Sequence, residues 1–506
     1  MQNCRDWIAS LLRQGVRLWV ENGELRFQAP KGALLPEARD ELRRRRVEVI
    51  QLLEKEDRVE EIPLQRREAN CSIPLTAMQR RRWLRRQEER RYRLRTSVSA
   101  TRVLGHLEVT HLEASLCALV RRHEPLRTRI IATMDTPYQQ IDPPAAYHLD
   151  LIDLSDMTTE ESEQNLQHIA EAFISEEVDF SVGPLFSTKL VKLSDTDHVF
   201  LMALNHMITD GASYGILRTE IWLMYELSWR GQDLRLPPVD LQFGDYAVWQ
   251  HNNYGAWMCR HAPYWRDHLW GAEPGRLPIC TQIAESQISG GTFRIEFGKE
   301  LTAAIHHFAQ LEQCLPSLVV FAVYTALMSM WTGQRDFLVR MVVDARYRPE
   351  LESMIGFVAS HLYLRIRRDP EETFRESLKR VQREFYAAYD HLDFDRLPDF
   401  ISECAETEIH FNWIAESRWF NESHREAVGP LTLQAFPLRT ARILNFTPFF
   451  LDSNAGIVGI VQYREDRFSS DVLTRFGDGL QHLTRVCVKS PDLKIQEILT
   501  WPSDRR

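Results

Sequence analysis

Hydrophobic and polar positions over residues 1–57 follow the pattern of a small helix–strand–strand–helix unit. Apolar side chains recur at helical spacing over 6–14 and again over 36–55, with Gly15 as a stop signal and Pro36 as a start signal. A unit of this size buries little surface, so it often completes its core against a partner. The alternative is a cap packed on the rest of the chain.

Between the two predicted helices, the pattern changes to the alternation of a β-hairpin. Apolar side chains occupy every second position over 16–20 and again at 25 and 27. The Asn22-Gly23 pair between them favours the left-handed backbone of a two-residue hairpin turn. We therefore expect two antiparallel strands joined at these residues.

The rest of the chain alternates between strand-like and helix-like patterns, without a short repeat. Charged residues dominate 58–70, which we interpret as a linker. Mixed α/β stretches follow at 71–250 and 251–506. With 506 residues and 44% hydrophobic content, the chain can bury the cores of two to four domains or lobes.

The most apolar stretch, residues 315–331, approaches the length of a membrane span. It begins with a proline and a serine, contains Tyr324 and Ser329, and is followed by Gly333. Proline in the first turn and glycine after the last are typical ends of a helix in a soluble protein. We expect a buried core helix and no membrane-spanning segment.

Charge and cysteine usage limit the partners and the compartment. A formal net charge of -9 and a pI near 6.1 argue against nucleic acid as an electrostatic partner. The eight cysteines are scattered without a CxxC pair, which suits reduced thiols and provides neither a disulfide framework nor a zinc site. The N-terminus is charged and lacks an apolar signal core, so we expect a cytoplasmic protein.

A strand-like apolar run at 199–204 ends in a polar cluster at 205–211 with the sequence NHMITDG. A strand end can hold an imidazole rigidly, and Gly211 lets backbone or substrate pass close by. Near neutral pH, His206 can take a proton from an attacking amine or hydroxyl, so acyl transfer is the first chemistry to consider. A lone histidine after a strand is more often structural, and the other motifs of the chain decide between the two.

Residues 205–211 match the motif HHxxxDG except at its first position, and further motifs occur in a fixed order along the chain. They are LTAMQ at 75–79 with WL at 83–84, RHEPLRT at 122–128, DF at 179–180 with GPL at 183–185, FGDYAVWQ at 243–250, and RYRPEL at 346–351 with IGFV at 355–358. Over nearly everything from 72 to 500, the chain resembles the condensation domains of nonribosomal peptide synthetases. A single HxxxDG string is a weak signal, whereas five or more ordered matches are a strong one.

The resemblance implies an α/β (α+β) fold of two chloramphenicol-acetyltransferase-like lobes in a V-shaped pseudo-dimer, with a tunnel between them. Two phosphopantetheine arms bearing thioesters would enter from opposite faces and meet at His206. This histidine would position the acceptor amine and take up its proton. Gly211 would keep the tunnel wall open, and backbone N–H groups after it would polarise the thioester oxygen.

Asp210 is expected to be structural rather than catalytic. A buried carboxylate is costly unless a cation pairs with it, and Arg127 and Arg346 are both candidate partners. We expect no metal ligand among the site residues.

Two positions depart from the family. Asn205 stands where the family has its first histidine, although an asparagine side chain still donates and accepts hydrogen bonds. Ala359, Ser360 and His361 replace the family's Asn-Thr after Gly-Phe-Val, which alters a polar group near the acceptor side of the tunnel. His361 is expected at a core or surface position, with compensation for that polar group as the alternative.

A different motif overlaps the cluster, because residues 211–215 read GASYG and fit the G-x-S-x-G elbow of serine hydrolases. That elbow needs a strand that runs directly into its first glycine, whereas polar residues including Asp210 lie between the strand and Gly211. We interpret Ser213 as a tunnel-wall or helix-start residue.

Arginines dominate residues 79–86, which read QRRRWLRR. Such a stretch can bind phosphate or an acidic partner, but it is more often the solvated face of an amphipathic helix. We favour the solvated face, with recognition of an acidic carrier protein as the alternative.

Residues 14–34 resemble the TubC-type N-terminal docking domain of assembly-line synthetases, on the runs QGVRLW and APKGAL. That family recruits the C-terminal tail of an upstream protein. The resemblance implies that the hairpin, with Arg17 and Trp19, accepts a partner strand.

Together, these patterns predict a stand-alone condensation enzyme that transfers a carrier-bound acyl or peptidyl thioester to an amine and forms an amide. Its expected partners are carrier proteins, an upstream synthetase and, in one version, a free amine. Phosphopantetheine arms of the carriers are substrates, and no covalently bound cofactor is expected. The alternatives are a catalytically silent docking scaffold, motivated by Asn205 and by residues 359–361, and an ester-forming or product-releasing acyltransferase.

Overall fold

The computed structural model describes most of the chain. The described residues are 17–21, 24–28, 36–50, 62–88, 97–133, 136–278, 290–392, 396, 407–415, 425–436, 445–453 and 455–498. They form two compact units, described separately below. The smaller contains the described residues up to 64 together with 249–270, and the larger contains those of 65–248 and 271–506.

The smaller unit begins with the predicted hairpin. Strand β1 (Arg17–Glu21) pairs antiparallel with β2 (Glu24–Gln28), and Trp19 lies opposite Arg26. This pairing confirms the hairpin and its register about residues 22–23. Helix α2 (Pro36–Arg44) begins at the predicted proline. The predicted helix over 6–14 and the side chains of Arg17 and Trp19 lie outside the described residues.

The smaller unit also contains helix α9 (Tyr254–Leu269). Hydrogen bonds tie this part of the chain to Ile62. Its N–H donates to Oδ1 of Asn253 at 2.8 Å, and its carbonyl accepts from Nε1 of Trp249 at 2.6 Å. Defined contacts therefore hold part of the segment that was predicted to be a linker.

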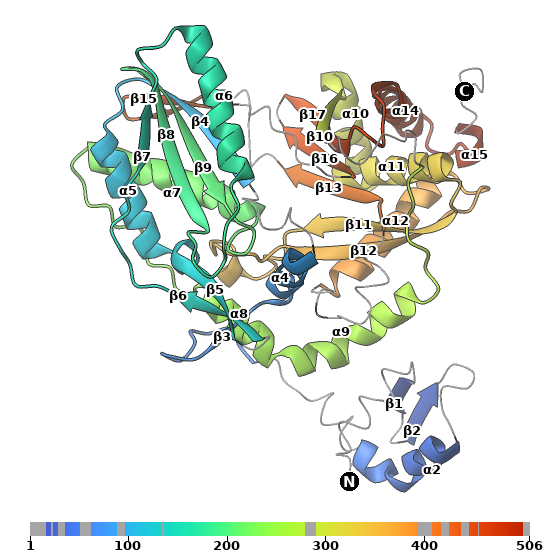
Figure 1. Cartoon of the computed structure of the whole chain (residues 1–506). Helices are drawn as coiled ribbons and strands as arrows, with labels where there is room; N and C mark the ends of the chain where they lie inside the picture. Colours follow the sequence, from blue (N-terminus) through green and yellow to red (C-terminus); the bar gives the residue numbers. More distant parts are fainter. Residues whose placement is uncertain are drawn as a thin grey trace. The chain divides into compact units, whose positions relative to one another are not determined.

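The larger unit contains two lobes, each built on a six-stranded sheet (Figure 1). The first sheet has the order β14-β15-β4-β9-β8-β7. Its strands are β4 (Ser97–Leu104), β7 (Asp150–Asp153), β8 (Phe186–Ser194), β9 (Asp197–Leu204), β14 (Arg425–Val428) and β15 (Leu431–Ala435). Its helical segments are α4 (Ala77–Glu88), α5 (Val109–Arg122), η2 (Glu124–Arg127), α6 (Thr159–Ser175), α7 (Gly211–Trp229) and α8 (Phe243–Asn252). A small sheet beside it contains β3 (Ile73–Pro74), β5 (Thr128–Thr133) and β6 (Thr136–Ile141).

Strand β9 lies in the middle of the first sheet and is covered on both faces. Phe200, Met202 and Leu204 belong to a core shared with α5 and α7. Val199 and Leu201, on the opposite face, belong to a second core shared with α6. A strand covered on both faces reads as a continuous apolar run, which explains the sequence at 199–204.

Two strands reach the first sheet from far along the chain. Strand β15 pairs antiparallel with β4, and Leu433 lies opposite Val103. Strand β14 pairs with β15 and forms the edge of the sheet. The predicted lobe boundary at residue 250 therefore does not separate the two sheets, because residues 425–435 lie beyond it.

The second sheet has the order β10-β17-β16-β13-β11-β12. Its strands are β10 (Gly290–Glu296), β11 (Asp336–Val343), β12 (Ser360–Arg367), β13 (His410–Ala415), β16 (Phe446–Ser453) and β17 (Gly456–Arg464). Its helical segments are α10 (Gly298–Leu311), α11 (Pro316–Thr332), η4 (Pro349–Leu351), α12 (Phe374–Tyr389), α14 (Ser470–Lys489) and α15 (Ile495–Ile498). This mixed α/β architecture of two lobes agrees with the predicted fold class.

Helix α11 is the predicted core helix. Every residue from Leu318 to Met328 is buried, Pro316 occupies the first turn, and Gly333 caps the end with a left-handed φ of 72°. Among the described helices, none alone is long and apolar enough to cross a membrane. The α10–α11 pair reaches that length and composition only together, and the two helices meet at 105°.

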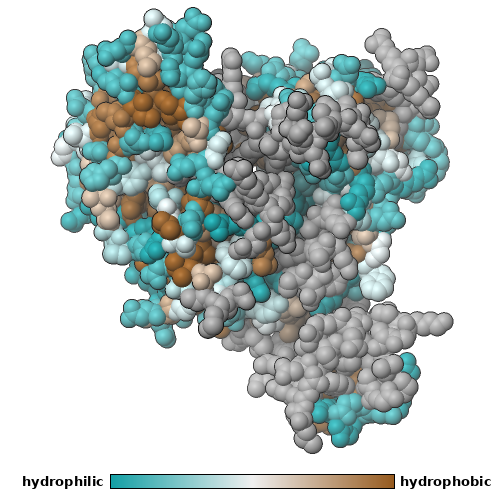
Figure 2. Space-filling view, in the orientation of Figure 1, coloured by the Kyte–Doolittle hydropathy of each residue, from teal (hydrophilic) through white to brown (hydrophobic). Residues whose placement is uncertain are grey.

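On the visible face of the first lobe, patches of hydrophobic side chains lie among hydrophilic ones (Figure 2). The large hydrophobic residues exposed in this lobe include Leu151, Met157, Val182, Leu223 and Trp229. The polar site described next lies where the two lobes meet.

Candidate active site

The polar cluster predicted at the end of β9 forms a tight loop between β9 and α7. The carbonyl of Asn205 accepts from the Ile208 N–H and from Oγ1 of Thr209, both at 3.0 Å. Gln79, at the start of α4, donates from Nε2 to the carbonyl of Met207 at 2.6 Å. These bonds fix the backbone on both sides of His206.

The side chain of Asn205 is part of this loop. Its Oδ1 accepts from the Met207 N–H at 3.0 Å, which sets the orientation of the amide because an N–H needs an acceptor. Its Nδ2 is buried and has no hydrogen-bond partner among the described residues. Asn205 therefore holds the loop through one end of its amide.

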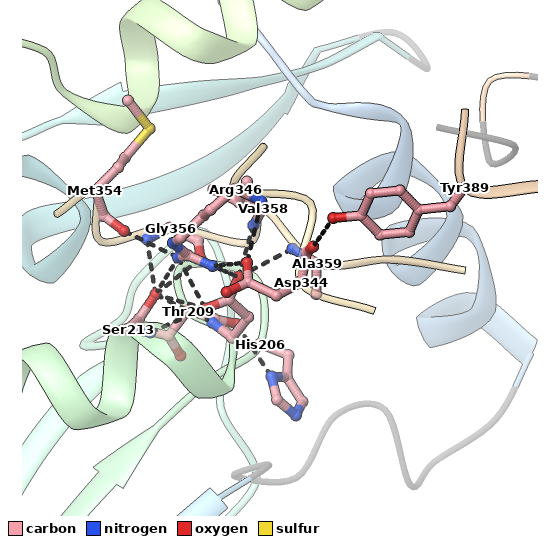
Figure 3. A network of polar contacts seen from close by, with 11 residues as sticks. His206, Thr209, Ser213, Asp344, Arg346, Met354, Gly356, Val358, Ala359 and Tyr389 are labelled. Carbon is pink, nitrogen blue, oxygen red and sulfur yellow. Dashed lines mark hydrogen bonds and ion pairs between the residues drawn. The ribbon is translucent and has the colours of Figure 1, made fainter. Parts of the chain in front are cut away.

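His206 is the only residue of 201–210 that is not buried. Its Nδ1 lies 3.0 Å from the carbonyl of Thr209, and a carbonyl only accepts, so Nδ1 carries a proton. In the neutral ring, Nε2 is then the basic nitrogen. The ring stacks on Phe357 of the second lobe, with centroids 5.7 Å apart, and points away from the network around Ser213 and Arg346 (Figure 3).

Asp210 joins the two lobes. It pairs with Arg346 through both carboxylate oxygens, at 2.8 and 3.0 Å. Its Oδ1 also accepts the N–H of Ser213, which caps α7, and Oδ2 accepts the N–H groups of Val358 and Ala359 at 3.0 and 2.9 Å. The carboxylate thus fastens the first lobe's helix to the second lobe's backbone.

Charge pairing keeps Asp210 ionised despite its burial. Burial alone would raise the pKa of this carboxyl, but the Arg346 guanidinium and the Ser213 hydrogen bonds hold the pKa below its ordinary value. Burial opposes the charge of Arg346 as well, and Asp210 and Asp344 nevertheless raise the pKa of the guanidinium. Asp210 is therefore a structural anion and has no proton to exchange near neutral pH.

Ser213 belongs to the same hydrogen-bond network between the lobes. It is fully buried, and its hydroxyl lies 2.8 Å from Oδ1 of Asp210 and 2.9 Å from the carbonyl of Gly356. The hydroxyl also accepts from the Gly356 N–H at 3.0 Å and from Arg346 at 3.2 Å. An enclosed serine in a helix cap is not a nucleophile, and residues 205–210 separate the end of β9 from Gly211, where α7 begins.

The backbone at Gly356 leaves no room for a side chain. A Cβ there would lie 2.1 Å from Cδ2 of Phe243, in the first lobe. Glycine therefore allows residues 354–359 to approach the first lobe closely enough for Val358 and Ala359 to reach Asp210.

Of the two candidate partners of Asp210, the structure pairs Arg346 with it and places Arg127 elsewhere. Arg127 donates from Nη1 to the carbonyl of Asp142 in the first lobe. Gly211 is the first residue of α7, directly after the cap residue. Sequence alone did not identify Gln79 as a site residue. It belongs to the LTAMQ motif, but its hydrogen-bond partner Met207 is 128 residues away along the chain.

Of the departures at 359–361, Ala359 directly precedes β12, and Ser360 and His361 begin it. Ser360 is buried. His361 is partly exposed, and its Nδ1 lies 3.2 Å from Nη1 of Arg81. An arginine only donates, so Nδ1 of His361 is the acceptor here. Among the described residues, no group of three or more His, Cys, Asp or Glu side chains is placed to hold a metal ion.

Residues 70–506 match the Condensation domain family, and residues 5–55 match the TubC N-terminal docking domain. The chain belongs to the condensation-domain family. One component of the linear gramicidin synthase of Brevibacillus parabrevis is 28% identical to this condensation domain over 435 residues. The match covers 84% of this chain but only 8% of that synthase protein, so the chain spans a small part of the relative's length.

Two solved structures share the fold of this condensation domain. The X-domain from teicoplanin biosynthesis superposes with a TM-score of 0.74 at 22% identity and covers 86% of this chain and 99% of its own. The EpoB cyclization-docking bidomain of Sorangium cellulosum superposes with a TM-score of 0.69 at 18% identity and covers 97% of this chain and 99% of its own. At these identities, the likeness concerns the fold.

Proposed function

We propose that this condensation domain transfers a carrier-bound acyl or peptidyl group to an amine and forms an amide, with His206 as the catalytic residue. The observation that carries the proposal is the orientation of this histidine. Its Nδ1 proton is bonded to Thr209, so the basic Nε2 belongs to the one side chain of 201–210 that is not buried. A fixed tautomer on a partly exposed ring suits a base that receives a proton from an attacking amine.

In the proposed reaction, the amine nitrogen attacks the thioester carbonyl carbon and the C–N bond forms as the carbonyl electrons move to oxygen. Nε2 of His206 accepts the proton that the nitrogen loses. Collapse of the tetrahedral species breaks the C–S bond, and the departing thiolate takes that proton from the imidazolium. A positioned base contributes about 10²- to 10⁴-fold, so the positioning of two bound substrates supplies much of the remaining rate.

The partners in this proposal are carrier proteins whose phosphopantetheine thioesters are the substrates. An upstream synthetase would dock its C-terminal tail on the 1–57 unit, 58–70 would link this unit to the lobes at 71–250 and 251–506, and a cytoplasmic setting would suit such an assembly. The hairpin of β1 and β2 supports this part, because an open strand edge can accept a further strand.

Intact-mass measurement of product formed from an acyl-loaded carrier and candidate amines tests the catalytic role. We expect His206→Ala to lower the rate by about 10²- to 10⁴-fold. Exposed His168 on α6 provides the matched control, and His168→Ala should leave the rate unchanged. Full activity of His206→Ala would contradict the proposal. Release of free acid by the wild type that is lost in Ser213→Ala would favour a hydrolase.

Deletion of residues 1–57 tests docking separately from catalysis. Binding of the upstream protein's tail should be lost, while turnover of directly supplied small thioesters should persist. Trp19→Ala in the full chain should weaken tail binding in the same direction. Loss of both properties on deletion would indicate a structural cap instead of a docking domain.

A further inference from the structure

Helix α4 is built in the opposite way from the solvated amphipathic helix that its sequence predicts. Arg81 is only 9% exposed, whereas Leu84 on the same helix is 49% exposed. Arg86 also turns inward, with its guanidinium carbon 4.5 Å from the ring centroid of Phe180. The solvated-face interpretation is therefore wrong for Arg81, since a leucine faces solvent while an arginine is buried.

Arg81 reaches the second lobe. Its Nη1 lies 3.2 Å from Nδ1 of His361, and its Nη2 donates to the hydroxyl of Tyr363 at 3.0 Å. Two residues earlier, Gln79 holds the carbonyl of Met207, next to His206. Helix α4 therefore runs from the loop of the proposed active site to strand β12, beside which it lies in Figure 1. Arg85, one turn after Arg81, shares its side of the helix.

The face of the second sheet that α4 approaches is opposite to its helices. Phe411 packs against Phe321 of α11 with ring centroids 4.9 Å apart, so its neighbour His410 points to the other face. Arg340 pairs with Tyr363 on one side and His410 on the other, which places all three side chains in one row. Nη2 of Arg340 lies 3.5 Å from Nδ1 of His410.

In the next row on this face, one residue is open to solvent. Val342 pairs with His361 and with Asn412, and it is 41% exposed although it lies on an inner strand of the sheet. A β-branched residue at that position is normally covered by packing. The exposure leaves room for a ligand beside the row of cationic and imidazole groups.

Positive charge converges on this face. Burial, and after it the charge of Arg340, holds the pKa of His410 well below its ordinary value. His361 and Arg85 lower it further. His410 is therefore neutral, and arginines from both lobes gather around it. Guanidinium groups match the planar geometry of a carboxylate and bind it through charge-assisted hydrogen bonds.

Residues 357–361 connect the proposed active site to this face of the second sheet. Phe357 stacks on His206, and His361 follows four residues later. Four residues span at most about 14 Å. A short stretch of the second lobe therefore links this face to the proposed active site.

We propose that Arg81, Arg85 and Arg340, with His361 and His410 beside them, bind a carboxylate carried by the acceptor amine. This inference rests on the proposed function, because it specifies which amines the site accepts. The acceptor class is then an amino acid or another amine with an acidic group, rather than a simple alkyl amine. A phosphate group has similar chemistry, and the test below separates the two sources.

The first test compares γ-aminobutyrate with butylamine as acceptors for an acyl-loaded carrier, since the two differ only in the carboxylate. We expect Arg340→Gln to raise KM for γ-aminobutyrate about tenfold or more and to leave butylamine within about twofold. Arg340→Lys should restore part of the difference. The control is Arg80→Gln, because Arg80 lies on α4 and is exposed. Equal use of both amines by the wild type, or an equal loss for both in Arg340→Gln, would overturn the inference.

The second test is independent of turnover and uses calorimetric titration of the full-length chain with glutarate and with inorganic phosphate. Glutarate binding that weakens about tenfold in Arg340→Gln supports a carboxylate site, even where no amine is turned over and the proposed function itself fails. Binding of phosphate without glutarate would overturn the assignment to a carboxylate. Thermal unfolding of each variant identifies loss of binding that is due to misfolding. Arg340 is the position tested because it is less buried than Arg81.

Discussion

The polar loop of residues 205–211 contains two ionisable side chains four positions apart, and the fold treats them in opposite ways. Asp210 is enclosed and receives hydrogen bonds from the cap of α7, from Arg346 and from the second lobe's backbone. His206 is partly exposed, and its Nδ1 proton is fixed by Thr209. A carboxylate whose oxygens all accept hydrogen bonds holds the two lobes together, whereas a titratable ring with one fixed nitrogen can take part in proton transfer.

The two roles depend on each other through adjacent residues. Thr209, whose carbonyl orients His206, directly precedes Asp210. Phe357, which stacks on His206, directly precedes Val358, whose N–H binds Asp210. The pair of Asp210 with Arg346 therefore positions both the backbone and the ring that hold His206. The experiments below test this division between fastening and chemistry.

Removal of one partner of the buried pair should have the largest effect on stability. Arg346→Ala leaves the Asp210 carboxylate buried without its cation, which costs about 3–5 kcal/mol of the free energy of unfolding. Urea denaturation measures the loss. Arg367→Ala is the control, because this second-lobe arginine is 64% exposed and its removal should change stability by less than about 0.5 kcal/mol. Equal effects of the two substitutions would mean that Asp210 is not a fastener.

A methyl group at Gly356 should disturb the same junction without changing any charge. Because Phe243 occupies the space, Gly356→Ala should cost about 1–3 kcal/mol and lower the rate together with stability. The matched control is Gly255→Ala in α9, where nothing lies within 4 Å of the added Cβ. That substitution should stabilise its helix by up to about 1 kcal/mol. If Gly356→Ala changed neither stability nor rate, the two lobes would be able to separate slightly without loss of either.

The asparagine before His206 should have a smaller effect. Asn205→Ala removes the acceptor of the Met207 N–H and also the buried Nδ2 that has no partner among the described residues, so the net cost should be about 1 kcal/mol. Exposed Asn252 supplies the control, Asn252→Ala. Asn205→His restores the family's first histidine. A large gain in rate in this variant, at unchanged stability, would indicate that Asn205 limits catalysis rather than only holding the loop.

Low pH should reduce the stability that ionised Asp210 contributes. The pKa of Asp210 is lowered in the folded protein, so the charged form contributes stability above its unfolded value of about 3.9, and this contribution is lost as pH falls toward the folded pKa. The difference in unfolding free energy between wild type and Asp210→Asn should therefore be constant near neutral pH and shrink below about pH 4. A difference that grows in acid would contradict the lowered pKa.

The local features of the fold could be predicted from sequence. The Asn22-Gly23 pair indicated the register of the β1–β2 hairpin, and the proline and glycine around 316–333 marked the ends of α11. These signals act within a few residues, so local patterns contain them. The loop after β9 was recognisable for the same reason, because its apolar run and its polar cluster are contiguous.

Contacts between distant parts of the chain could not be predicted in this way. Arg127 and Arg346 were equivalent partners for Asp210 until the fold placed the latter within reach, 136 residues away. The sequence of α4 predicts a solvated helix because a pattern within the helix does not depend on the second lobe. In the structure, Tyr363 of the second lobe bonds Arg81, which is buried. The motif identified the histidine, but only the tertiary structure showed which groups hold it.

The crossing of residues 425–435 into the first sheet has a consequence for how this chain can be divided. A fragment that ends at residue 250 would retain β4 without β15 and expose an unpaired row of N–H and C=O groups along that strand. Such an edge pairs readily with other chains, so the fragment should aggregate when produced alone. Supplied with the complementary fragment, the same edge becomes a site of reassembly. The two lobes are thus halves of one folding unit, and light scattering of the separate and the mixed fragments would measure this.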